Sequence, residues 1–131
     1  MRILQQFYNA LHKPVNNIDE EKIEYIHVQL KGLYPEYLKR DDSFFYENDI
    51  STILHFLGEG KSNDSIAKIT LLSELIYNDA ILNSSPTLKK NLLSKALELL
   101  LFINDNGKTF SAERDSRIVQ IREILKGYTE F

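Results

Sequence analysis

The stretch Ser85–Gly107, SPTLKKNLLSKALELLLFINDNG, decides the fold of this chain. Ser85 can cap a helix N-terminus through its hydroxyl, and Pro86 suits the first helical position, where a backbone N–H has no partner within the helix. Gly107 follows an Asn-Asp-Asn run and can close the helix in the left-handed conformation. Apolar residues between these signals cover most of the helix circumference. Other helices enclose a helix of this kind, so we expect it at the centre of the molecule.

The remainder of the chain also shows helical periodicity, and no stretch has the alternation of a half-buried strand. The apolar spacing and the cap residues predict helices over residues 3–11, from Asn17 to just before Pro35, from Asp42 or Ser43 to Gly58, from Ser62 or Asn63 to about residue 82, and from Ser111 to Gly127. About four residues join the fourth of these helices to the leucine-rich one, which predicts an antiparallel hairpin. The sequence therefore predicts an all-α fold with a single domain, 1–131. We expect a compact bundle of roughly five or six antiparallel helices around a central helix at about 86–104.

The composition excludes several classes of protein. The chain has no cysteine, so it has no disulfide, no thiolate nucleophile and no cysteine-ligated zinc. Its hydrophobic fraction of 43% and charged fraction of 27% are typical of a globular protein, and a net charge of −3 gives no general attraction to polyanions. The longest apolar run of the central helix, Leu99–Ile103, is far shorter than the roughly 20 residues of a membrane span. Because Met1–Phe7 lacks the apolar core of a secretion signal, we expect a cytoplasmic protein with no membrane partner.

No pattern in the chain indicates catalysis or a cofactor. Glu24 and His27 have the Glu-x-x-His spacing of di-iron bundles, but such sites need a second copy, and the chain has none. The acidic clusters at Asp19–Glu21 and Asp41–Asp42 fall at expected helix starts, where negative charge favours the positive end of the helix dipole. We therefore expect no enzyme, no metal and no cofactor. An enzyme or ligand-binding protein would need a buried polar pocket, which His27 or His55 facing a carboxylate inside the bundle would indicate.

One segment resembles a DNA-binding motif. Residues Ile53–Ala67, followed by Ser73-Glu74, resemble the helix-turn-helix of quorum-sensing-type response regulators. That family carries a Gly-x-Ser-Asn-x-x-Ile-Ala core, matched here by Gly60–Ala67, and a Ser-Glu pair that opens its recognition helix. The resemblance implies, as the alternative function, a nucleic-acid-binding regulator that uses residues 50–82. A recognition helix exposes polar and basic side chains to the major groove, so this interpretation fails if residues 73–82 expose only Glu74, Asn78 and Asp79.

The last helix is basic, with acidic residues interleaved. Glu113 and Arg117 have the spacing of a favourable surface ion pair, so we expect a solvated helix face here.

The segment Tyr34–Tyr46 combines five aromatic residues with charges of both signs. Tyrosine and arginine are enriched among the residues that dominate the energetics of protein interfaces. The candidate partner-binding residues are Tyr34, Tyr37, Arg40, Phe44, Phe45 and Tyr46. Alternatively, these rings pack onto the helices as a lid over the core. We expect a non-enzymatic helical module, of the adaptor or immunity-protein kind, that binds another protein.

Overall fold

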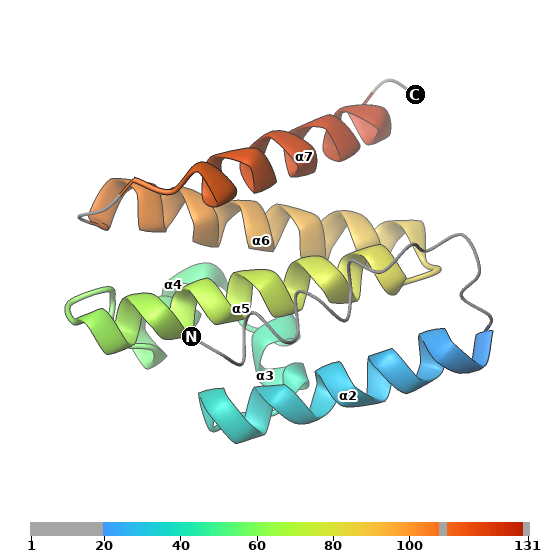
Figure 1. The fold of residues 1–131 in the computed structure, drawn as a ribbon, viewed down its shortest axis with the longest axis horizontal. Coiled ribbons are helices and arrows are strands. Elements are labelled where there is room, and N and C mark those ends of the chain that lie inside the picture. Colours follow the sequence, from blue (N-terminus) through green and yellow to red (C-terminus); the bar gives the residue numbers. More distant parts are fainter. Residues whose placement is uncertain (1–19, 108–109, 130–131) are drawn as a thin grey trace.

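The computed structural model of the chain describes residues 20–107 and 110–129, which form six helices (Figure 1). Four helices are long and two, α3 and α4, are short. Their bounds are α2 Glu20–Leu38, α3 Asp42–Glu47, α4 Ile50–Phe56, α5 Asn63–Leu82, α6 Pro86–Asn106 and α7 Ala112–Thr129. The described residues contain no strand, and the prediction of a compact all-α bundle is confirmed. The helix expected at residues 3–11 lies outside the described residues.

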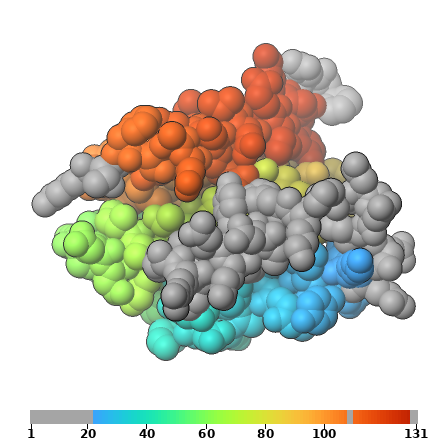
Figure 2. Space-filling view, in the orientation of Figure 1, coloured from blue at the N-terminus to red at the C-terminus, as the bar shows by residue number. Residues whose placement is uncertain are grey.

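The four long helices lie side by side and alternate in direction, in the order α2, α5, α6, α7 (Figure 1). The hairpin of α5 and α6 forms the most extensive contact, as the short connection predicts. Helices α3 and α4 cover this layer from one side, where α3 contacts α2 and α4 contacts α6. On the face shown in Figure 2, the atoms of α2 and α7 lie at opposite edges. The core therefore lies around the α5–α6 pair, and α5 buries more residues than the leucine-rich α6.

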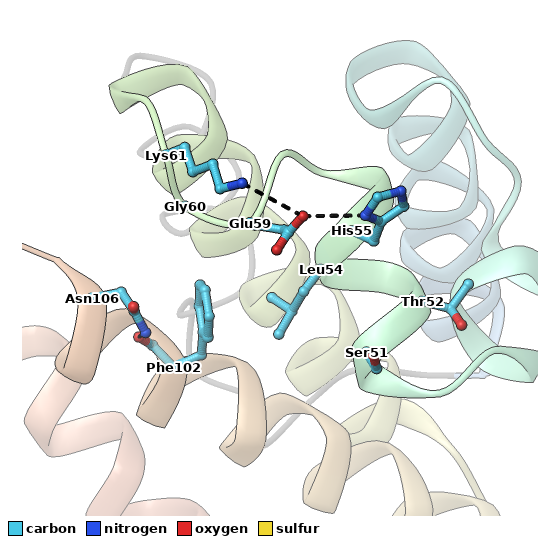
Figure 3. Close-up of a pocket in the computed structure, with 9 residues that line it drawn as sticks. All are labelled: Ser51, Thr52, Leu54, His55, Glu59, Gly60, Lys61, Phe102 and Asn106. Atoms are coloured by element: carbon cyan, nitrogen blue, oxygen red, sulfur yellow. Dashed lines mark hydrogen bonds and ion pairs between the residues drawn. The ribbon is translucent and has the colours of Figure 1, made fainter.

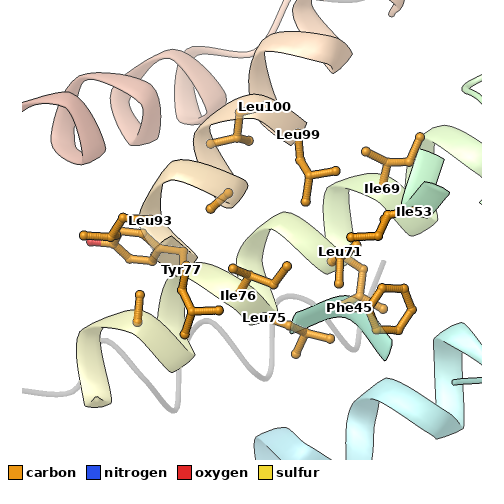
Figure 4. Packing of buried hydrophobic residues seen from close by; sticks show 14 of the residues in the cluster. Phe45, Ile53, Ile69, Leu71, Leu75, Ile76, Tyr77, Leu93, Leu99 and Leu100 are labelled. Atoms are coloured by element: carbon orange, nitrogen blue, oxygen red, sulfur yellow. The ribbon is translucent and has the colours of Figure 1, made fainter. Parts of the chain in front are cut away.

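Side chains from five helices fill this core (Figure 4). Helix α5 contributes Leu72, Leu75 and Ile76, and α6 contributes Leu93 and Leu99, all with no exposed surface. Burying one such side chain contributes about 1.5–3 kcal/mol relative to leaving it in water.

The predicted helix starts are confirmed where a serine supplies the cap. The Ser62 hydroxyl accepts a hydrogen bond from the Ser65 N–H, and the Ser85 hydroxyl accepts one from the Leu88 N–H. The Ser111 hydroxyl accepts one from the Arg114 N–H at 3.1 Å. Gly107 does follow α6, but its φ of −81° is not left-handed as expected. A Cβ there would lie 2.7 Å from the carbonyl oxygen of Ile103, so the position needs glycine because the backbone comes so close.

Three predicted helix ends are wrong. Helix α2 passes through Pro35 to Leu38, because a proline in the last turn removes only one intrahelical N–H while Tyr34 and Leu38 gain burial. The expected Asp42–Gly58 helix is two helices, because Asp49 accepts a hydrogen bond from the Thr52 N–H at 2.8 Å and starts α4 afresh. Helix α7 continues past Gly127 to Thr129, since a single glycine costs a helix only about 1 kcal/mol.

The geometry does not follow the helix-turn-helix resemblance. Helix α5 is continuous from Asn63 to Leu82, without a turn before Ser73, where the recognition helix would begin. Asn78 and Asp79 are buried, Glu74 is only partly accessible, and Ile81 is the most exposed large apolar residue of this stretch. Residues 50–82 thus present no polar or basic helix face for a DNA groove, and the alternative function loses the feature on which it depended.

Among the described helices, none combines the length and the apolar character that crossing a membrane requires.

Candidate functional site

Half of the predicted partner-binding residues pack inward. Tyr34 on α2 and Phe45 on α3 have no exposed surface, and Tyr46 is half-buried. The Tyr34 ring lies 5.8 Å from the Phe45 ring and meets the Tyr46 ring edge-on at 6.3 Å, between ring centroids. These three rings form the lid over the core that the sequence left as the alternative.

The remaining candidates stay accessible. Tyr37 is half-buried on the last turn of α2, and Arg40 is exposed in the connection that follows. The guanidinium carbon of Arg40 lies 5.8 Å from the ring centroid of Phe44 and 5.0 Å from that of Phe56. The two rings are themselves 5.1 Å apart. We call Arg40, Phe44 and Phe56 the Arg40 patch.

Phe56 is the member of the patch that the sequence analysis missed. It lies on α4, outside the Tyr34–Tyr46 segment, and 36% of its surface is exposed. The chain reversal between α3 and α4 brings it against Phe44. A signal was available, because a phenylalanine beside the exposed His55 on a short helix is not needed for the core stripe of Ile53 and Leu57.

Lys95 of α6 fixes the lid to the bundle. Its ammonium donates to the carbonyl oxygens of Phe45, Tyr46 and Asn48 at 2.8, 2.9 and 2.8 Å. These carbonyls are at the end of α3, where the helix dipole favours a cation. Partial burial lowers the pKa of Lys95, and the nearby Glu98 and Asp49 oppose this shift. The segment that carries the Arg40 patch is therefore tied to α6 by three charge-assisted hydrogen bonds.

A buried carboxylate joins α2, α3 and α5. Asp79 on α5 is 2% exposed, and its Oδ2 accepts hydrogen bonds from the Tyr34 hydroxyl and, at 2.5 Å, from the Tyr46 hydroxyl. Burial raises the pKa of Asp79, while the two tyrosine hydrogen bonds and His27 act in the opposite direction. Burial also raises the pKa values of Tyr34 and Tyr46, and the Asp79 charge adds to both shifts. Both phenols are consequently donors to this carboxylate at neutral pH.

His27 stands beside the second oxygen of the same carboxylate. Its Nδ1 lies 3.8 Å from Asp79 Oδ1, and its side chain is 44% exposed. His27 also lines a pocket of about 300 Å³ with Ile23, Glu24, Leu82, Asn83 and Ser84. The arrangement named in the sequence analysis as the sign of a ligand-binding protein, a histidine facing a carboxylate inside the bundle, is thus present at His27. His55 instead contacts Glu59 at 3.2 Å on the surface.

A larger groove of about 740 Å³ lies between α4, the α4–α5 loop and α6 (Figure 3). Leu54 and Phe102 line it from α4 and α6, and Gly60 comes so close that a Cβ would lie 3.0 Å from the Phe102 ring. Its charged residues pair with one another, since Glu59 contacts both His55 and Lys61, at 3.2 and 3.9 Å. The histidine and lysine side chains are 84% and 79% exposed, so this is an open groove with a solvated rim.

The expectation of a solvated face around Arg117 is wrong. Arg117 is 4% exposed, and its Nε and Nη2 donate to the two carboxylate oxygens of Glu74, both at 3.2 Å. The guanidinium also lies 4.0 Å from the ring centroid of Tyr77 and donates to the Gln120 side chain at 2.8 Å. This bidentate pair joins α7 to α5.

Within residues 20–107 and 110–129, no three histidine, aspartate or glutamate side chains gather as a metal site would need. His12 lies outside these residues.

Comparison of the chain with protein-family models, with curated proteins and with solved structures found no match.

Proposed function

We propose that this protein is a non-enzymatic protein–protein interaction module and that it binds its partner through the Arg40 patch. The observation that carries the proposal is the stacking of the exposed Arg40 guanidinium on the rings of both Phe44 and Phe56. Arginine and aromatic residues dominate the binding energy of protein interfaces. A sequence interpretation of the whole Tyr34–Tyr46 segment is thereby narrowed to its accessible residues, with Phe56 added.

The stacked arrangement suits a particular partner chemistry. A guanidinium that stacks through its flat face keeps its N–H donors in the plane of the group, where a carboxylate can accept two of them. The neighbouring rings supply apolar contact area. We therefore expect a partner protein that presents an aspartate or glutamate next to an apolar side chain.

The support beneath the patch favours binding without rearrangement. Phe44 packs edge-on against the fully buried Phe45, with ring centroids 5.1 Å apart. Lys95 and the Asp49 cap hold the two short helices in place. A pre-ordered surface loses less conformational entropy on binding, which raises affinity.

Site-specific photo-cross-linking tests this function. The photoreactive amino acid p-benzoylphenylalanine replaces Phe56 in one variant and Val119, an exposed residue of α7, in the control variant. In cells that naturally make the protein, the Phe56 variant is expected to give a discrete adduct with one protein. An excess of unlabelled wild type should compete the adduct away, and an excess of the Arg40→Ala protein should not.

Two outcomes would contradict the proposal. One is competition by Arg40→Ala that equals competition by wild type, because binding would then not use the guanidinium. The other is the absence of any adduct that is specific to position 56 and absent at position 119.

A further inference from the structure

The pocket beside His27 has a defined hydrogen-bonding character. Both tyrosine hydroxyls bind Oδ2 of Asp79, while Oδ1 faces Nδ1 of His27. A carboxylate next to Nδ1 stabilises a proton on that nitrogen, so the neutral ring keeps its lone pair on Nε2. The nitrogen on the other side of the ring, away from Asp79, is therefore an acceptor for a ligand in the pocket that His27 lines.

The other groups around the pocket are also suited to a positive charge. Glu24 precedes His27 by three residues, which places its carboxylate on the same face of α2. Leu82 and Asn83 are the last residue and the C-cap of α5, so the pocket borders the negative end of that helix dipole. Among its lining residues there is no lysine and no arginine. Ile23 and Leu82 supply apolar surface.

We propose that this pocket binds a small primary amine in its ammonium form. The ammonium donates to Nε2 of His27 and to the Glu24 carboxylate, and a short alkyl chain lies against Ile23 and Leu82. The site is independent of the proposed function, because none of its lining residues belongs to the Arg40 patch. Asp79 is here a positioning residue, since it orients the histidine and does not line the pocket.

Titrations followed by amide chemical shifts in NMR spectra test the site at pH 8. The three probes are n-butylamine, n-butanol and butyrate, which share one alkyl chain length and differ in charge. We expect n-butylamine to shift the amide signals of Ile23, Leu82 and Ser84, with a dissociation constant about fivefold lower than that of n-butanol, as one half-exposed ion pair provides. Butyrate should bind more weakly than either. The imidazole ¹⁵N spectrum should show the Nε2 signal of His27 moving on addition of the amine.

Two glutamate variants on the same helix complete the test. Glu24→Gln should reduce n-butylamine affinity to that of n-butanol, whereas Glu36→Gln, an identical change of charge at an exposed position of α2, should leave it unchanged. Both positions are exposed, so both variants are expected to fold. The proposal is overturned if n-butylamine and n-butanol bind equally, if neither binds, or if the two variants behave alike.

Discussion

Helix α5 carries two carboxylates that are withdrawn from solvent in different ways. Glu74 meets the Arg117 guanidinium at 3.2 Å through both oxygens, so a full positive charge balances it. Asp79 meets two neutral phenols, and its nearest cationic group is a histidine 3.8 Å away. The first carboxylate belongs to a closed pair between α5 and α7. The second is next to an accessible pocket.

The difference separates a carboxylate that the fold depends on from one that the fold tolerates. Breaking a buried ion pair leaves an uncompensated charge and is strongly destabilising. Removing the charge of Asp79 relieves a desolvation penalty, as its raised pKa indicates. Burying a charge without a stability gain is characteristic of functional sites, which agrees with the ligand pocket beside His27.

The largest expected effect comes from breaking the closed pair. Arg117→Met should lower the free energy of unfolding by about 3–5 kcal/mol, because it leaves Glu74 without its counter-charge. Urea denaturation measures the change. Arg122→Met, an exposed change on the same helix, should alter it by less than about 0.5 kcal/mol. Equal losses in the two variants would show that the Arg117 pair contributes no more than a surface charge.

A smaller effect is expected at the phenol pair. Tyr34→Phe should cost about 1–3 kcal/mol, since it removes a fully buried donor from the Asp79 carboxylate. Tyr46→Phe should cost less, about 1 kcal/mol, because the half-buried Tyr46 position lets water replace the lost hydroxyl. Thermal or urea unfolding distinguishes the two. A larger loss in Tyr46→Phe than in Tyr34→Phe would contradict this ranking.

The smallest expected effect is a pH dependence with an unusual sign. The pKa of Asp79 is raised in the folded protein above its ordinary 3.8, so the folded state holds this proton more tightly than the unfolded state. The contribution of Asp79 to stability is therefore fully present below the unfolded pKa and is lost as the pH rises through the folded pKa. The stability of Asp79→Asn relative to wild type should increase between about pH 4 and pH 7. A decrease over that interval, measured by urea denaturation at each pH, would mean that the folded protein stabilises the Asp79 charge.

Local signals predicted the parts of the fold that depend on neighbouring residues in the chain. Ser62, Ser85 and Ser111 each cap the helix expected of them, because an N-cap bonds to a backbone N–H three residues away. The α5–α6 hairpin followed from a short loop between two apolar helices. Of the predicted site, the accessibility of Arg40 and Phe44 agrees with a binding role, whereas Tyr34 and Phe45 belong to the core.

The buried polar residues escaped prediction because their partners are distant in the sequence. Arg117 follows an acidic residue at helical spacing, yet its partner Glu74 is 43 positions earlier. Lys95 bonds to carbonyls 47 to 50 residues away, and no property of its own helix indicates them. Asp79 did carry a signal, because a lone aspartate within the apolar run Leu75–Leu82 has to find buried donors.

The most direct test of the contrast is to neutralise each carboxylate of α5 without changing its shape. At pH 7, Glu74→Gln should lower the free energy of unfolding by about 3 kcal/mol, because the buried Arg117 loses its anion. Asp79→Asn should remain within about 0.5 kcal/mol of wild type or exceed it, since the amide oxygen still accepts from both phenols. If Asp79→Asn loses as much stability as Glu74→Gln, both carboxylates support the fold equally and the contrast is wrong.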